Sequence, residues 1–244
     1  MNNHSKNNIV HDFSNRIVLV TGGTGALGSS ITKAFVESKA TVISSYINDK
    51  EESLKETENK LSIQLIKADI TKEEEVSRLV STIMDKYGHI DILANVVGGI
   101  IEPKNVIELD EKEWDLMMAM NLKSAFLISK HVARQMISSK YGKIIHISSK
   151  KGLHAEGSDS AYAASKSGLI RLVESLSEET KESNINVNCV MPILIDTQAN
   201  RKAMPNADFN KWVKPSDLAN VVLFLSSEEA KTIKGAAIST FGVL

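Results

Sequence analysis

Short apolar segments rich in β-branched residues alternate along this chain with longer segments whose apolar residues recur at helical spacing. The expected strands are 16–20, 41–47, 63–66, 90–97, 143–148, 185–190 and 236–240. The expected helices are 27–39, 49–61, a segment capped by Thr71, 111–136 with a break near Asn121, 161–181 and 215–227. Strands that are apolar on both faces and separated by helices are typical of a parallel sheet covered on both sides. The pattern predicts an α/β protein with a Rossmann-like, doubly wound parallel sheet.

The domain organisation follows from the length of 244 residues, which suits one large hydrophobic core. No repeat, low-complexity tract or change of composition marks a linker. We expect residues 1–14 to be a flexible polar tail and residues 15–244 to be a single domain built on this Rossmann-like sheet. Ligands bind beyond the carboxyl ends of the strands in such folds, and a long segment at about 193–214 is expected to act there as a substrate lid.

Composition argues against several classes of protein. The formal net charge of −1 lacks the basic excess of a dedicated nucleic-acid binder. No apolar run approaches the roughly 18 residues that a membrane span needs, and the polar first residues lack the apolar core of a signal peptide. The single cysteine, Cys189, excludes a disulfide scaffold and fits a reducing compartment, and the histidines show no metal-site spacing. We expect a cytoplasmic protein with no metal, membrane or nucleic-acid partner.

A glycine-rich turn follows the first expected strand and opens the first expected helix. Its sequence, from Thr21 to Gly28, is TGGTGALG. Glycines allow a tight turn, and the helix that follows offers free N–H donors and the positive end of its dipole to a diphosphate. This context predicts dinucleotide binding, with cofactor contacts at Gly22, Thr24, Gly25, Ala26, Leu27 and Gly28.

A second group of residues carries the expected chemistry. Tyr162 and Lys166 stand four residues apart on one expected helix face. Ser149 ends a strand 13 residues before Tyr162, Asn121 interrupts the long helical segment, and Asn95 lies near the end of the fourth strand. Together with the glycine turn, these residues make the chain resemble the short-chain dehydrogenase/reductase family over about 16–242.

The resemblance implies a catalytic set of Asn121, Ser149, Tyr162 and Lys166. It implies further cofactor contacts at Tyr46, Asp69, Ile70, Asn95, Tyr162, Lys166, Pro192 and Thr197. Two positions depart from the pattern: Ala26 replaces the middle glycine of T-G-x-x-x-G-x-G, and Ile193 replaces the glycine that often follows the proline. The glycines also fit the T-G-x-x-G-x-x-G of the longer members, but the length of the chain favours the short branch.

The expected reaction moves a hydride between nicotinamide and a carbonyl or secondary alcohol, with Tyr162 as general acid and base. A free tyrosine has a pKa of about 10, which a nearby cation lowers. Lys166 is expected to supply that cation and, by resemblance, to bind the nicotinamide ribose. Ser149 would polarise the substrate oxygen, and Asn121 resembles the residue that holds a water on the proton path.

The choice between NAD and NADP depends on the end of the second strand. An acid there would bind the adenosine ribose and repel a 2′-phosphate, but the chain has Tyr46 at that position and Ile47 next. Neither the acid of NAD-using relatives nor the arginine frequent in NADP-using ones is present, and the missing acid favours NADP. Possible phosphate or ribose contacts nearby are Ser45, Asn48, Asp49 and Lys50, which equally fit a plain polar turn.

Three functions remain open at this point. The first is the carbonyl or alcohol oxidoreductase, which by resemblance would be a homotetramer joined through the Tyr–Lys helix and the C-terminal strands. The second is a pterin reductase, because the segment 196–212 resembles the corresponding loop of dihydropteridine reductases, although those enzymes lack a serine at the place of Ser149. The third is a dinucleotide-binding sensor or scaffold without turnover. Lys150 and Lys151 are expected to be a solvated pair, and Trp212 either a lid residue or a packing anchor.

Overall fold

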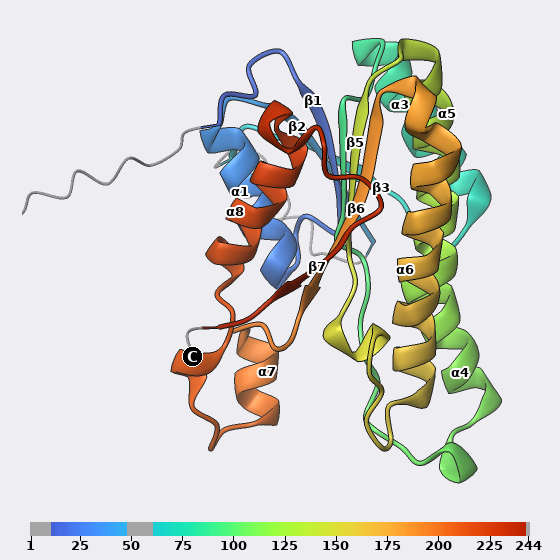
Figure 1. The fold of residues 1–244 in the computed structure, drawn as a ribbon, viewed down its shortest axis with the longest axis vertical. Coiled ribbons are helices and arrows are strands. Elements are labelled where there is room, and N and C mark those ends of the chain that lie inside the picture. Colours follow the sequence, from blue (N-terminus) through green and yellow to red (C-terminus); the bar gives the residue numbers. More distant parts are fainter. Residues whose placement is uncertain (1–10, 48–60, 243–244) are drawn as a thin grey trace, which may run out of the picture.

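The computed structural model describes residues 11–47 and 61–242 (Figure 1). Within these ranges seven parallel strands form one sheet in the order β3-β2-β1-β4-β5-β6-β7. The strands are β1 (Ile17–Thr21), β2 (Thr41–Tyr46), β3 (Gln64–Lys67), β4 (Ile92–Asn95), β5 (Gly142–Ile147), β6 (Ile185–Pro192) and β7 (Ala237–Thr240). The predicted doubly wound parallel sheet is confirmed, with strand ends within two residues of most of the expected ones.

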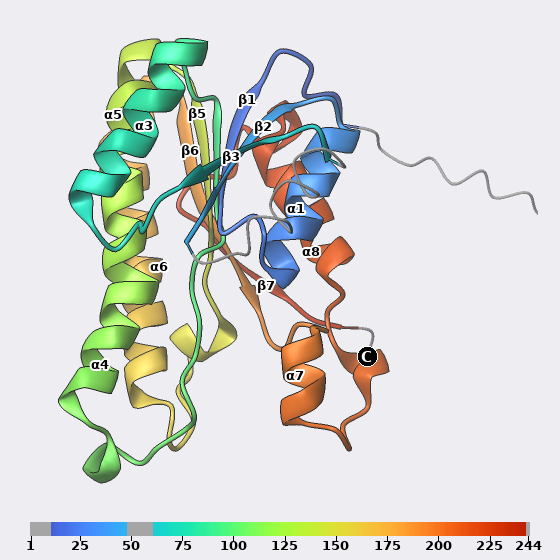
Figure 2. The same ribbon diagram turned by 180° about the vertical axis from the view of Figure 1, so that it is seen from behind.

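Helices cover both faces of this sheet (Figures 1 and 2). One face carries α1 (Ala26–Glu37) and α8 (Pro215–Ser226), and the other carries α3 (Glu73–Tyr87), α5 (Ser124–Ser139) and α6 (Ser160–Thr180). Two smaller helices, α4 (Glu111–Met118) and α7 (Gln198–Ala203), lie toward the carboxyl edge of the sheet. This is the edge at which the predicted site residues gather.

The alternation of side chains along each strand produces two separate cores. In β1, Val18 and Val20 point to the layer formed by α1 and α8, whereas Ile17 and Leu19 point to the layer formed by α3, α5 and α6. Each residue of this strand is therefore buried, which explains why its sequence is a continuous apolar run instead of an alternating one.

A chain of polar side chains crosses the middle of the sheet. The Thr21 hydroxyl donates to the Asn95 side-chain oxygen at 2.5 Å, the Asn95 amide lies 3.0 Å from Nδ1 of His146, and Nε2 of His146 lies 3.0 Å from the Ser129 hydroxyl. Burial lowers the pKa of His146 to about 3, so the ring is neutral and each of its nitrogens has a polar partner. The chain joins β1, β4 and β5 to α5.

Some predicted features differ from the structure or lie outside its described part. Thr71 does not cap α3; the helix begins after Lys72, and the Thr71 hydroxyl donates to Asp69 because that carboxylate forms a local turn. The predicted helix 49–61 lies almost wholly outside the described residues, as do residues 1–10 of the predicted tail. Phe13 of that tail is buried and packs edge-on against Phe35.

Candidate functional site

The glycine turn between β1 and α1 is shaped by direct backbone contact. Gly22 has a φ of +65°, a left-handed conformation that favours glycine. A side-chain carbon on Gly28 would lie 2.1 Å from the carbonyl oxygen of Gly22, so the first turn of α1 touches the loop before it. Ala26 is exposed and is not among the described residues with positive φ, so its methyl group fits where the family pattern has glycine.

The N-terminus of α1 points to the same edge and is open to a ligand. Gly25 occupies the cap position, and no described side chain accepts a hydrogen bond from the first turn. Thr24 is half-buried beside it, and Leu27 is buried under the helix. Free backbone N–H groups and the positive end of the helix dipole thus meet at the turn, which suits an anionic group.

Ser149 and Tyr162 face each other beyond the end of β5. Ser149 is 4% exposed, and its hydroxyl oxygen accepts a hydrogen bond from the backbone N–H of Lys151 at 3.2 Å. Burial raises the pKa of the Tyr162 phenol, while a hydrogen bond with Ser149 and the charge of Lys151 act in the opposite direction. The net pKa lies above the usual value of tyrosine, so the phenol is protonated near neutral pH.

Lys166 is buried on the same helix as Tyr162. Its ammonium lies 5.8 Å from the centre of the Tyr162 ring and donates to the carbonyl oxygen of Ile147 at 2.9 Å. Burial lowers its pKa to about 8. The charge of a second lysine, Lys151, lowers the pKa of the Tyr162 phenol. The effect of Lys166 on that phenol stays a prediction.

Asn121 lies in a single π-helical turn, Ala119–Lys123, between α4 and α5. Such turns occur frequently at functional sites. The side-chain oxygen of Asn121 accepts from the N–H of Gly99 at 2.9 Å, and its amide nitrogen donates to the Gly99 carbonyl and the Ser165 hydroxyl at 3.0 and 3.1 Å. A side-chain carbon on Gly98 would lie 2.9 Å from Asn121 Oδ1 and 3.0 Å from Lys166 Nζ, so both residues flank that backbone.

The other predicted cofactor positions lie along the same edge of the sheet. Tyr46 ends β2 and is half-buried, and Ile70 is buried. Asp69 accepts two hydrogen bonds from Thr71; burial opposes ionisation, but these bonds outweigh it and the pKa of Asp69 is lowered. The Asn95 side chain is held inside the sheet by Thr21 and His146.

The predicted lid follows β6. Pro192 is buried at the end of that strand, and the Thr197 hydroxyl caps α7 by accepting from the N–H of Asn200 at 3.2 Å. Trp212 is 7% exposed and packs edge-on against Phe209 with ring centres 4.8 Å apart. The tryptophan is therefore the packing anchor of this segment.

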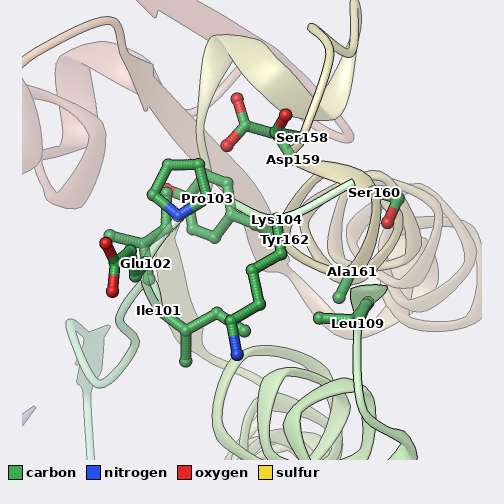
Figure 3. A pocket seen from close by; sticks show the side chains of 11 residues that line it. Ile101, Glu102, Pro103, Lys104, Leu109, Ser158, Asp159, Ser160, Ala161 and Tyr162 are labelled. Atoms are coloured by element: carbon green, nitrogen blue, oxygen red, sulfur yellow. The ribbon is translucent and has the colours of Figure 1, made fainter. Parts of the chain in front are cut away.

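A small pocket opens beside Tyr162. Its walls come from the start of α6 and from the segment that follows β4 (Figure 3). The lining residues are Ile100, Ile101, Glu102, Pro103, Lys104, Leu109, Ser158, Asp159, Ser160, Ala161 and Tyr162. Apolar side chains dominate one wall, and the carboxylate of Asp159 lies on the other side with the Tyr162 ring.

The sequence interpretation of Lys151 as one of a solvated pair was wrong. Its ammonium pairs with Asp159, whose side chain is 4% exposed, and lies 3.2 Å from Glu156. Asp159 was not singled out at all, although its place three residues before Tyr162 puts it at the start of the same helix. Cys189 is free and buried, and His154 is exposed.

Two kinds of feature are absent from the described residues, 11–47 and 61–242. No helix in them is both long and apolar enough to cross a membrane. No group of three or more metal-binding side chains occurs in that part of the chain.

Three features identify the class of protein: the parallel sheet, the glycine turn, and the side chains of Ser149, Tyr162 and Lys166 at one edge of the sheet. Together they define a dinucleotide-dependent oxidoreductase of the α/β class. The family model for the short chain dehydrogenases matches residues 16–208, and the chain belongs to this short-chain dehydrogenase/reductase family.

Relatives and solved structures agree with this assignment. The chain is 30% identical over 242 residues to a 3-oxoacyl-acyl-carrier-protein reductase, FabG, of Thermotoga maritima, with 94% of this chain and 97% of the relative covered. It is 31% identical to an NAD-dependent glycerol dehydrogenase of Listeria innocua, covering 92% and 91%. The solved structure of gox2181 superposes with a TM-score of 0.88 at 26% identity, covering 94% and 95%.

The protein is thus an NAD(P)-dependent oxidoreductase that transfers a hydride between nicotinamide and a carbonyl or secondary alcohol. These relatives are named as reductases or dehydrogenases, and they give no support to the pterin-reductase or sensor alternatives.

Proposed function

We propose that Tyr162 is the general acid and base of this reaction, assisted by Ser149, Lys166 and Asn121. The observation that carries the proposal is the gathering of the half-buried Tyr162 phenol with the buried Ser149 hydroxyl and Lys166 ammonium beyond the end of β5, beside a pocket. Groups with shifted pKa values that cluster beside a pocket are candidates for acid–base work.

Each side chain has a distinct task in reduction of a carbonyl. The Ser149 hydroxyl donates a hydrogen bond to the carbonyl oxygen and polarises the carbon–oxygen bond. The Tyr162 phenol is protonated near neutral pH, as tyrosine ordinarily is and as its raised pKa keeps it, and it gives its proton to that oxygen. Lys166 favours the phenolate that remains, and Asn121, fixed by Gly99 and Ser165, orders the path by which the proton is replaced.

The glycine turn and the open N-terminus of α1 fit a dinucleotide diphosphate, because free backbone N–H groups and the positive end of the helix dipole meet there. The close packing of Gly28 on the Gly22 carbonyl holds the turn against the helix. We assign the predicted cofactor contacts, from Gly22 to Gly28 and at Tyr46, Asp69, Ile70, Asn95, Tyr162, Lys166, Pro192 and Thr197, to dinucleotide binding. Nicotinamide, when bound, supplies the hydride.

We further propose NADP as the preferred cofactor. The end of β2 carries Tyr46 where NAD-specific relatives carry an acid, and the exposed Lys67 is the strand neighbour of Tyr46. A cation beside an uncharged ring suits a 2′-phosphate better than a carboxylate would. Asn48, Asp49 and Lys50 lie outside the described residues.

The assembly and location stay proposals of the same kind. We propose a homotetramer, with the half-buried Leu172 of α6 available for an interface; Leu169 and Val173 are in the core, and Leu176 packs against it. A cytoplasmic location is supported by the free, buried state of Cys189.

The direct test follows the absorbance of reduced nicotinamide with a panel of ketones and a quinonoid dihydropterin. Oxidation of the cofactor by ketones supports the proposal. Turnover with the dihydropterin alone, or tight cofactor binding with no turnover on any carbonyl, would overturn it.

A further inference from the structure

Lys151 connects two parts of the candidate site. Its backbone N–H donates to the Ser149 hydroxyl oxygen, which leaves the hydroxyl proton free to be directed elsewhere. Its side-chain ammonium is paired with the buried carboxylate of Asp159, immediately before α6, and with the exposed Glu156. One residue therefore ties the segment that carries Ser149 to the start of the helix that carries Tyr162.

Charged groups lie near Tyr162 on three segments of the chain. Asp159, Glu102 and Lys104 line the pocket with Tyr162, Lys166 lies on the same helix, and Lys151 follows β5. The other charged residues of the segment after β5 are Lys150, which lies against Phe241, and the exposed His154 and Glu156. Lys104 is neutralised by Glu113 at 2.6 Å. Two of these charges act on the phenol in opposite directions: that of Lys151 lowers the pKa of Tyr162, and that of Asp159 raises it.

Lys151 and Lys166 differ in how long they keep their charge as pH rises. Burial lowers the pKa of Lys166 to about 8. Burial also acts to lower the pKa of Lys151, but hydrogen bonds to Asp159 and Glu156 outweigh it and the pKa is raised. Above about pH 8, where Lys166 loses its proton, Lys151 still carries the charge that lowers the pKa of Tyr162.

We propose that Lys151 and Asp159 form a positioning pair that orients the Ser149 hydroxyl and balances the charge at Tyr162, in addition to Lys166. The pair acts through Ser149 and Tyr162 and is not itself part of the proton transfer. The inference rests on the proposed role of Tyr162 in the reaction.

The two members of the pair shift the pKa of the Tyr162 phenol in opposite directions, so the inference predicts pKa changes of opposite sign for the two single variants. Lys151→Met removes the cation and leaves the buried carboxylate of Asp159, so the pKa of Tyr162 rises. Asp159→Asn removes the anion and keeps the cap position polar, so the pKa falls. The double variant removes both charges and returns the value close to that of the unaltered protein.

The experiment titrates Tyr162 directly in the ligand-free protein. Tyrosines are labelled with ¹³C at Cζ, and the Tyr162 resonance is assigned by its loss in Tyr162→Phe. We expect opposite displacements of about one pKa unit in the two single variants, the range that a nearby charge produces. Lys151→Arg should keep the original value because it keeps the charge, and Lys151→Gln serves if the methionine variant does not fold.

Lys150→Met is the matched control, since the Lys150 ammonium lies 5.0 Å from the centre of the Phe241 ring and pairs with neither carboxylate. It should leave the Tyr162 titration unchanged. Displacements in the same direction for Lys151→Met and Asp159→Asn, or none in either, would overturn the inference, because a general loosening of the site cannot give opposite signs.

The titration requires neither substrate nor cofactor, so its result is independent of the proposed function. The pH profile of kcat/KM is then measured for the same variants. Displacements of the profile that follow the Tyr162 titration support both proposals. A profile that stays fixed while the Tyr162 resonance moves counts against Tyr162 as the acid and leaves the pair's action on the phenol standing.

Discussion

The ammonium of Lys166 donates a hydrogen bond to the carbonyl oxygen of Ile147, 2.9 Å away, at the last residue of β5. The lysine side chain is almost fully buried, and burial lowers its pKa to about 8 from an ordinary value of 10.5. Between these values the unfolded chain binds more protons than the folded protein, so this group makes the protein more stable as pH rises. Below pH 8 Lys166 is charged in the folded protein, so the full free-energy cost of burying that charge reduces the stability of the fold.

Lys166→Met should therefore stabilise the ligand-free protein at pH 7, by up to about 3 kcal/mol at about 1.4 kcal/mol per pKa unit. The gain should shrink between pH 8 and 10.5, as the unaltered lysine in the fold loses its proton. Urea unfolding of both proteins across this pH range measures the difference. Lys33→Met, on an exposed lysine, is the control, and a gain that grows with pH would contradict the expectation.

Tyr162→Phe should abolish carbonyl reduction and leave cofactor affinity nearly intact, since the change removes only the phenol oxygen. Loss of a general acid costs about 10²- to 10⁴-fold in rate. Steady-state turnover and fluorescence titration with reduced cofactor measure the two effects. Tyr141→Phe is a matched control, because the Tyr141 hydroxyl binds Glu228 away from the site. Retention of most of the turnover in Tyr162→Phe would remove this residue from the mechanism.

Gly28→Ala should weaken both the fold and cofactor binding. The new methyl carbon would meet the Gly22 carbonyl oxygen at 2.1 Å, a clash with backbone that cannot rotate away. Overpacking costs about 1–3 kcal/mol, more than the roughly 1 kcal/mol that alanine contributes in a helix. Thermal unfolding and cofactor titration are the measurements. At Gly157 a methyl group would enter open space, so Gly157→Ala should change neither the unfolding temperature nor cofactor affinity. Equal behaviour of the two variants would refute the close packing of Gly28 against the glycine turn.

The fold was largely predictable because its elements follow from local patterns. Strands buried on both faces gave uninterrupted apolar runs, and the break near Asn121 was visible as a change in the helical pattern. The sequence did not show that this break is a π-helical turn, because it does not reveal which carbonyl oxygen each backbone N–H binds. Sequence spacing also placed Tyr162 and Lys166 on one helix face.

The contacts that tune the site were less predictable, because they join residues that are distant along the chain. The partner of Lys166 is a backbone carbonyl 19 residues earlier, at the end of a strand. The pairing of Lys151 with Asp159 depends on a loop that folds back over eight residues. Which backbone group a side chain contacts, and how a loop runs, are set by the tertiary structure. Side-chain type alone therefore led to the incorrect prediction that Lys151 is one of a solvated pair.

Dissociation constants should be lower for NADPH than for NADH. Tyr46→Asp would place a carboxylate beside the 2′-phosphate and should weaken NADPH binding about tenfold or more, about 1.4 kcal/mol. Tyr46→Asn is the control, because asparagine has the size of aspartate but no charge. It separates the effect of the added charge on NADPH binding from the effect of losing the tyrosine ring. Isothermal titration gives both constants. At least tenfold tighter binding of NADH to the unaltered protein would overturn the preference.

The mass in solution should be that of a tetramer. Light scattering measures it directly, and a monomeric mass at micromolar concentration would contradict the prediction. Leu172→Lys changes a half-buried position of α6 and should dissociate the assembly, whereas the exposed Arg171→Lys should not.

The polar chain from Thr21 through Asn95 and His146 to Ser129 has a consequence for how the sheet aligns. In a sheet buried on both faces, a strand that slips along its neighbour still buries apolar side chains, so hydrophobicity alone defines the alignment weakly. Slippage of β4 would separate Asn95 from both partners and leave unpaired polar groups in the interior. These few hydrogen bonds therefore fix the register of three neighbouring strands. In doing so they fix the relative positions of the strand ends at which the candidate site lies.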